Sequence, residues 1–167
     1  AAPLLDTIHF HDELPDAIAS MREVVGFEPK DGRAAYRHFE LTEWHAQLAL
    51  PEELPLALVF GSEDEGLANS EVEHCRSLVS LPTYGSNYSY NLAQAVLLAL
   101  FSVAERGVRL IENSTTSEVQ EFPLWGEFTQ LDKLVFESMR RSGFLSRKIN
   151  VEVPAIMRSI LRRAKPN

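Results

Sequence analysis

Two stretches of this chain share one pattern, in which a short apolar run breaks into a polar loop that carries glycine. The first stretch is LALVFGSEDEGL (residues 56–67), and the second is LPTYGSNYSYNLAQAV (residues 81–96). A continuous apolar run of this kind is typical of a strand buried on both faces of a parallel sheet. Because parallel strands end at the same edge of a sheet, we expect the two loops to form one ligand pocket there.

The rest of the pattern predicts strands that alternate with helices, which indicates a mainly parallel α/β sheet. Buried strands are predicted over Glu23–Phe27, residues 54–60 and Ser77–Leu81. Helices are predicted over Leu14–Met21, from Asn69 with Ser70 and Glu73 as a capping box, and over Asn91–Glu105 with Gly107 as the stop.

A polar stretch without periodicity (residues 113–121) predicts a linker. The predicted organisation is therefore a domain over residues 1–110, a linker over residues 111–121, and a basic helical extension over residues 122–167. One helix of the extension is expected to end at Gly143, and another to start near Pro154. The first of these helices is expected to bury one face, made of Phe128, Leu131, Leu134, Val135 and Met139.

Charge is distributed unevenly along the chain, whose net charge is −8. Residues 132–167 hold nine Lys/Arg and three Asp/Glu, a net charge of +6, so the first 131 residues carry −14. A basic tail on an acidic body predicts contact with a polyanion, and a solvated helix pair explains the same charges equally well.

The remaining composition narrows the class of protein. The single cysteine, Cys75, argues against a disulfide framework and predicts a core thiol in a reducing cytoplasm. No apolar run has the length of a membrane helix, and the N-terminus lacks a secretory pattern. Ala1 is not an initiator methionine, so we expect it to be a processed end or the start of a truncated chain.

Taken alone, the two loops leave their chemistry open. Three carboxylates (residues 63–65) and no lysine argue against a phosphate loop; they suit a cationic or hydroxyl-bearing ligand, although a solvated acidic turn is the simpler interpretation. In the second loop Ser89, Tyr90 or Asn91 is expected to cap the helix that follows. No nucleophilic triad or metal-ligand spacing is recognisable, and both tryptophans are expected to be packing anchors.

Together the two loops resemble signature motifs of the SPOUT (α/β-knot) RNA methyltransferases, and within them the TrmH/TrmJ family. Residues 60–67 resemble the second motif of that family. Leu81-Pro82, followed by residues 89–96, resembles the third. Further similarity to TrmJ-type sequences lies in EVEHC (residues 71–75), FPL (122–124), SGF (142–144) and the final arginine-rich helix.

The resemblance implies an α/β fold with a C-terminal trefoil knot and an enzyme that methylates a ribose 2′-hydroxyl of RNA, with tRNA expected by analogy. The cofactor implied is S-adenosylmethionine. The expected assembly is a cytoplasmic homodimer formed through the knot domain and the helix that begins at Asn91, without a membrane, DNA or a metal.

The resemblance also assigns roles to residues. The catalytic residues it implies are Glu63, Ser89 and Asn91. The cofactor-binding residues are Gly26, Phe27, Glu28, Gly61, Gly66, Leu81, Pro82, Ser89, Tyr90 and Asn91. The RNA-binding residues are Arg140, Arg141, Arg147, Lys148, Arg158, Arg162 and Arg163.

Three departures from the family pattern are visible. The 167 residues contain no Asn-x-Gly-x-x-x-Arg loop, the first motif, whose arginine is the family's proposed general base. The chain is therefore expected to begin roughly 50 residues into the domain. Tyr90 stands where leucine is usual, and Gly26-Phe27-Glu28-Pro29 replaces small polar residues. Two alternatives stay open: a non-catalytic knot protein that binds RNA or dimerises, and a flavodoxin-like binder of small molecules.

Overall fold

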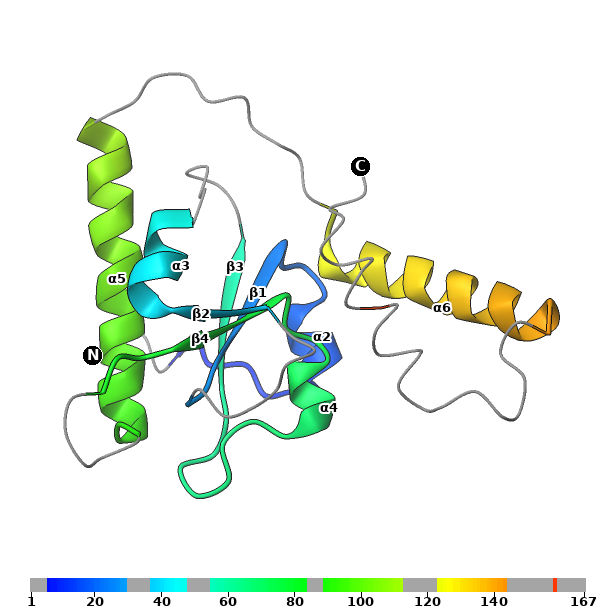
Figure 1. Cartoon of the computed structure of the whole chain (residues 1–167), viewed down its shortest axis with the longest axis horizontal. Coiled ribbons are helices and arrows are strands. Elements are labelled where there is room, and N and C mark those ends of the chain that lie inside the picture. Colours follow the sequence, from blue (N-terminus) through cyan, green and yellow to red (C-terminus); the bar gives the residue numbers. More distant parts are fainter. Residues whose placement is uncertain are drawn as a thin grey trace.

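The structure is a computed structural model that describes residues 6–29, 37–47, 55–83, 89–112, 123–143 and 158. Strands and helices alternate along most of the chain, and helices cover both faces of the sheet (Figure 1). The elements are α2 (Leu14–Ile18), β1 (Glu23–Phe27), β2 (His38–Glu40), α3 (Leu41–Gln47), β3 (Leu56–Phe60), α4 (Asn69–Val72), β4 (Ser77–Ser80), α5 (Leu92–Glu112) and α6 (Trp125–Arg141).

The sheet has four strands in the order β2-β4-β1-β3, and each neighbouring pair is parallel. β1 pairs with β3 over its whole length, from Glu23 opposite Leu56 to Phe27 opposite Phe60. β4 is buried throughout, as expected for a strand covered on both faces. The predicted parallel α/β sheet is confirmed.

Successive residues of each strand point to opposite faces of the sheet and enter two separate cores. On one face Val24, Val59 and Leu78 pack with residues of α2, α4 and α6. On the other face Val25, Phe27 and Val79 pack with residues of α3 and α5. The two tryptophans are buried in different cores, Trp125 in the first and Trp44 in the second, so their prediction as packing anchors is confirmed.

Several helix boundaries differ from those predicted. The capping residue of α4 is Ala68, whose N–H donates to Glu71 Oε2 at 2.7 Å, so the predicted capping box at Ser70 and Glu73 is wrong. α5 continues through Gly107 to Glu112, because one glycine costs a helix only about 1 kcal/mol. Gly143 has a φ of +74° directly after the end of α6, which confirms it as the stop.

The buried face of α6 agrees only in part with the one predicted. Phe128 is buried as predicted, but Leu131 and Leu134 are exposed, and Trp125 and Asp132 are buried instead. The prediction considered apolar residues alone, so it did not include the charged Asp132. The second predicted helix of the extension, near Pro154, lies outside the described residues. The chain between residues 84 and 88 does too, and the trefoil knot stays a prediction.

Candidate functional site

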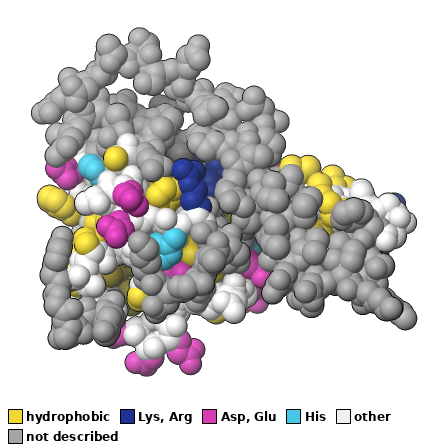
Figure 2. Space-filling model, viewed as in Figure 1, with side chains coloured by type: hydrophobic (Ala, Val, Ile, Leu, Met, Phe, Trp, Pro, Cys, Tyr) yellow, Lys and Arg dark blue, Asp and Glu magenta, His cyan; other side chains and the backbone are white. Residues whose placement is uncertain are grey.

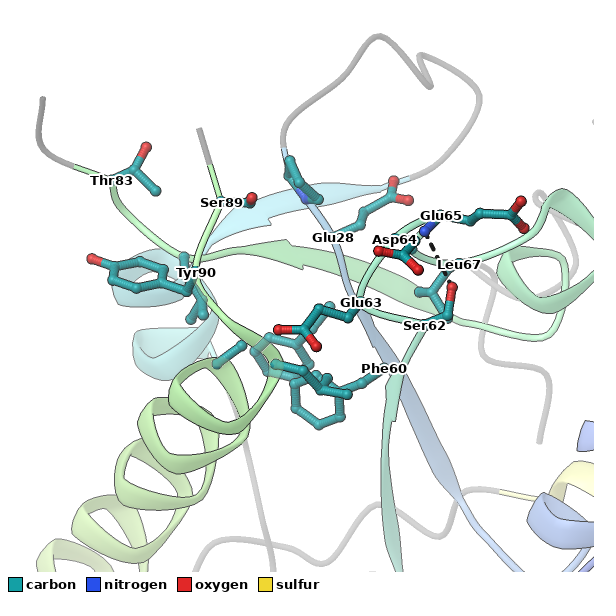
Figure 3. Close-up of a pocket in the computed structure, with 17 residues that line it drawn as sticks. Glu28, Phe60, Ser62, Glu63, Asp64, Glu65, Leu67, Thr83, Ser89 and Tyr90 are labelled. Carbon is teal, nitrogen blue, oxygen red and sulfur yellow. Dashed lines mark hydrogen bonds between the residues drawn. The ribbon is translucent and has the colours of Figure 1, made fainter. Parts of the chain in front are cut away.

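A cavity of about 300 Å³ lies where β1, β3 and β4 end and α5 begins (Figure 3). This is the edge at which open parallel sheets bind ligands. Eight of the residues predicted for the site line the cavity: Phe27, Glu28, Gly61, Glu63, Gly66, Leu81, Ser89 and Tyr90. The structure therefore brings together the ends of three strands that lie far apart in the sequence.

The loop after β3 is closed by its own backbone. Gly66 N–H donates to the Ser62 carbonyl at 3.0 Å, and Ser62 Oγ accepts from Glu65 N–H at 3.2 Å. A Cβ added to Gly61 would lie 1.9 Å from the carbonyl carbon of Gly66, so no side chain fits there. Gly66 has a φ of +68°, the left-handed region that favours glycine. Both glycines of the motif are thus required by the turn itself.

Asn91 links the loop after β3 to the loop that precedes α5. Its Nδ2 donates to Glu63 Oε1, and its Oδ1 accepts from Ala93 N–H at 3.0 Å. The Asn91 carbonyl accepts from Ala95 N–H at 2.9 Å, as the residue before a helix does. The same side chain therefore caps α5 and fixes the position of the acidic loop, so the capping and the site roles of Asn91 are compatible.

Tyr90 connects the two ends of the second loop by a hydrogen bond. Its hydroxyl donates to the carbonyl of Pro82 at 2.8 Å, and the half-buried ring lies at the cavity. Leucine, the residue usual at this place in the family, has no hydroxyl and cannot make this bond. Tyr90 thus supplies a contact that the family pattern does not predict.

Two aromatic rings form one wall of the cavity. Phe27 stacks on Phe60 with 4.8 Å between ring centroids, and Trp44 meets Phe27 edge-on at 5.7 Å. Phe60 is not among the residues predicted for the site, although strand alternation in β1 and β3 places it on the same face as Phe27. Gly26 is oriented to the other core: a Cβ there would lie 2.8 Å from Cys75 Sγ.

The polar groups of the cavity are mostly acidic. Four carboxylates line it, those of Glu28, Glu63, Asp64 and Glu65, and none of the described residues that line it is Lys, Arg or His. In Figure 2 acidic side chains project at the lower edge, where the loop after β3 lies in Figure 1. Such a wall disfavours anionic ligands and favours a ligand that carries positive charge.

The structure describes three of the seven predicted RNA-binding residues, and they lie in different surroundings. Arg140 and Arg141 lie in the last turn of α6, and Arg141 pairs with Glu137 at 2.7 Å on the surface. Arg158, whose side chain is 35% exposed, pairs with the partly exposed Glu73 and with the buried Asp132. Arg147, Lys148, Arg162 and Arg163 lie outside the described residues.

The described residues also bear on metal and membrane binding. Within them, no three His, Cys, Asp or Glu side chains are grouped so that they could hold a metal ion. None of the helices in those ranges combines the length and apolar character needed to cross a membrane.

Comparison with known proteins places the chain. Residues 1–101 match the SpoU rRNA Methylase family. The tRNA (cytidine/uridine-2'-O-)-methyltransferase TrmJ of Yersinia pestis (strain Pestoides F) is 28% identical over 159 residues, which are 93% of this chain and 62% of that protein. TrmJ of Citrobacter koseri is 27% identical over 169 residues, which are 99% of this chain and 70% of that protein.

A solved structure supports the fold. The crystal structure of TrmJ from Z. mobilis ZM4 matches 98% of this chain and 69% of its own, with a TM-score of 0.78 at 16% sequence identity. The predicted resemblance to TrmH/TrmJ-type SPOUT methyltransferases is confirmed, with the chain spanning just under two thirds of the length of its Yersinia relative. This chain belongs to the SpoU rRNA methylase family.

Proposed function

We propose that this chain forms the cofactor pocket of an S-adenosylmethionine-dependent methyltransferase that modifies a ribose 2′-hydroxyl of tRNA. The observation that carries the proposal is the hydrogen bond from Asn91 to Glu63, which joins the family's second and third motifs at the rim of one cavity. The TrmJ relatives, named for transfer of methyl to cytidine and uridine 2′-oxygens of tRNA, support the substrate.

The lining residues fit S-adenosylmethionine, which carries a sulfonium and an ammonium group beside a flat adenine. Four carboxylates give the cavity a negative wall for the two cations. The stacked rings of Phe27 and Phe60, with Leu81 and Leu92, give it an apolar wall for a planar ring. We assign six residues to the pocket wall: Phe27, Glu28, Gly61, Gly66, Leu81 and Tyr90. Gly26 and Pro82 are assigned to the layer next to that wall.

The bound cofactor would supply an electrophilic methyl group, and the chain would supply position. A ribose hydroxyl is a weak acid, so a general base contributes about 10²–10⁴-fold. Holding the reacting groups in line contributes much of the rest. In this proposal Glu63 and Asn91 fix the two loops relative to each other, and Ser89 presents a hydroxyl to the cavity.

The general base needs a separate source. The family's Asn-x-Gly-x-x-x-Arg motif is absent from these 167 residues, and this observation favours the second candidate function, a knot-fold protein that binds RNA or dimerises without catalysis. The codons that precede Ala1 in the gene discriminate between the two. The motif there supports the enzyme, and a start codon directly before Ala1 supports the scaffold.

α5 is the surface that we assign to a second copy of the chain. Leu97, Leu100 and Phe101 are between 54% and 67% exposed, and their spacing places them on one stripe of the helix. A stripe of large apolar side chains facing water marks a protein interface. The proposed assembly is a cytoplasmic homodimer that retains the family's trefoil knot.

Arg140 and Arg141 belong to the surface that we assign to RNA. Both lie in the last turn of α6, and both are exposed. The pair between Arg141 and Glu137 lies at the surface and is worth less than about 1 kcal/mol, so a phosphate can replace it. RNA affinity is then expected to fall steeply as salt concentration rises.

Asn91→Ala in the full gene product tests the site. We expect methyl transfer to tRNA to fall about 100-fold or more, because the two loops lose their link. Loss of the helix cap costs only about 1 kcal/mol, so the protein stays folded. Asn69→Ala, at an exposed asparagine that begins α4, is the matched control. Near-normal turnover by the Asn91 variant would contradict the assignment.

Two measurements test cofactor and substrate separately. Calorimetry with S-adenosylmethionine should detect binding to the purified protein, and failure to bind would favour a different small-molecule ligand. Mass mapping of ribose methylation in tRNA from cells that lack the gene should reveal one missing methyl group. An unchanged map would contradict the proposed substrate and leave the cofactor result standing.

A further inference from the structure

Asp132 is a carboxylate on the inner side of α6, and its residue is only 8% exposed. Burying an unpaired charge is expensive, so buried carboxylates in proteins are paired with cations. Asp132 therefore requires a positively charged group at this place in the fold.

Arg158 supplies that group and contacts two more residues. Its Nε lies 3.2 Å from Asp132 Oδ2, and its Nη1 donates to Glu73 Oε2 at 3.0 Å. Its Cζ lies 4.9 Å from the centre of the Phe136 ring. The guanidinium thus has carboxylates at two of its edges and an aromatic face against its plane, which is an arrangement that suits arginine and not lysine.

The three partners of Arg158 come from two different parts of the fold. Asp132 and Phe136 are four residues apart and so share one face of α6. Glu73 is the C-terminal capping residue of α4, the helix that directly follows the loop after β3. An arginine bound there connects α4, α6 and the C-terminal segment of the chain.

We propose that Glu73, Asp132 and Phe136 form a receptor for an arginine side chain, and that its occupant is Arg158 of the same chain. The receptor anchors the C-terminal segment to the domain. This goes beyond the proposed methyl transfer and assigns Arg158 to contacts within the protein and not to RNA. A phosphate near Arg158 would meet two carboxylates first, whereas Arg140 is exposed on the last turn of α6.

Arg158→Gln and Arg140→Gln are matched variants, because each removes one positive charge from the extension. We expect Arg158→Gln to lower Tm by about 4 °C or more, which corresponds to more than 1 kcal/mol for a chain of this size. It should also increase the rate at which chymotrypsin cleaves the protein by about tenfold, since cleavage follows the population of the opened state. Arg140→Gln should change neither quantity. Equal behaviour of the two variants would overturn the proposal.

Two more measurements distinguish the anchor from an RNA contact and from a partner's arginine. Arg140→Gln should reduce the salt slope of tRNA binding by about 1, and Arg158→Gln should leave it unchanged. A slope reduced by Arg158→Gln would overturn the proposal, as would protection from chymotrypsin that rises with protein concentration, since that indicates a second copy. The Tm and protease measurements need no RNA, so they stand if the proposed methyltransferase activity fails.

A double-mutant cycle checks that Glu73 acts through Arg158. Glu73→Gln and Arg158→Gln each remove one partner of the same contact, so the Tm loss of the double variant should be smaller than the two single losses added together. Additive losses would mean that the two side chains act independently, which contradicts a shared receptor.

Discussion

The two long helices of this protein, α5 and α6, lie on opposite sides of the sheet (Figure 1). They differ in how many of their large apolar side chains are buried. α6 inserts Trp125 and Phe128 into the protein, and Trp125 joins the core of α2 and α4. α5 buries Ala99 and leaves Leu97, Leu100 and Phe101 exposed. α6 therefore anchors two aromatic side chains in the protein, although its Leu134 stays exposed, whereas α5 exposes a stripe of three large apolar side chains.

This contrast has a structural cause in the first turn of α6. The N–H groups of Trp125 and Gly126 donate to the carbonyls of Met21 and Ala19, at 2.7 Å and 3.0 Å. A Cβ at Gly126 would lie 3.2 Å from the Ala19 carbonyl oxygen, so the helix approaches the turn after α2 at backbone distance. The start of the extension is thus packed as part of the domain, although the sequence predicted a boundary at residue 122.

Trp125→Ala should have the largest effect, because it leaves a cavity in the core between α6, α2 and α4. Removing a fully packed tryptophan costs about 3–5 kcal/mol of the free energy of unfolding. Urea denaturation measures the loss. Leu134→Ala on the same helix is the control: Leu134 is 63% exposed, so its loss should stay within about 0.5 kcal/mol. Equal losses for the two variants would mean that α6 does not pack on the domain as described.

Phe101→Glu should have the next largest effect, because it places a charge in the open stripe of α5. We expect the dissociation constant of the homodimer to rise about 100-fold, or 2.7 kcal/mol, while the monomer stays folded. Sedimentation equilibrium measures the constant.

Leu134→Glu is the matched control for the dimer. Leu134 and Phe101 are almost equally exposed, at 63% and 65%, on opposite sides of the sheet. If both substitutions weaken the dimer alike, the contrast between the two sides is wrong. A wild-type protein that stays monomeric at all concentrations would show that the apolar stripe of α5 is not a self-association surface.

The sequence predicted the parts of this fold that depend on local pattern. Buried strands appear as apolar runs, so β1 was predicted with its observed bounds and β3 and β4 with nearly correct ones. The pairing of the two loops followed from the parallel sheet, and the structure brings Asn91 to Glu63. The family resemblance was visible because the motif glycines are required by the turn, as the close approach of Gly61 and Gly66 explains.

The features that the sequence did not reveal either are too short to give a recognisable pattern or depend on contacts between distant segments. β2 and α3 were missed because a strand of three residues and a helix of seven give too short a pattern. The buried face of α6 was assigned only in part, because Asp132 looks like a surface residue until Arg158 is placed beside it. Phe60 was not predicted as a pocket residue, although the alternation of β3 places it on the same face of the sheet as Phe27.

Gly26→Ala adds a single methyl group to the core that contains Trp125. It should have a smaller effect than Trp125→Ala or Phe101→Glu. The new Cβ would lie 2.8 Å from Cys75 Sγ, 2.9 Å from Leu78 Cδ2 and 3.0 Å from Leu67 Cδ1, so three packed side chains must shift. Overpacking of this kind costs about 1–3 kcal/mol in the free energy of unfolding, again measured in urea.

Adding Cys75→Ala removes the nearest obstacle, so the double variant should lose less than the two single losses combined. Additive losses would mean that the space beside Gly26 is not set by Cys75. Because Gly26 is oriented away from the cavity, S-adenosylmethionine binding should be kept in the folded variant, and a selective loss of binding would show instead that Gly26 contacts the cofactor.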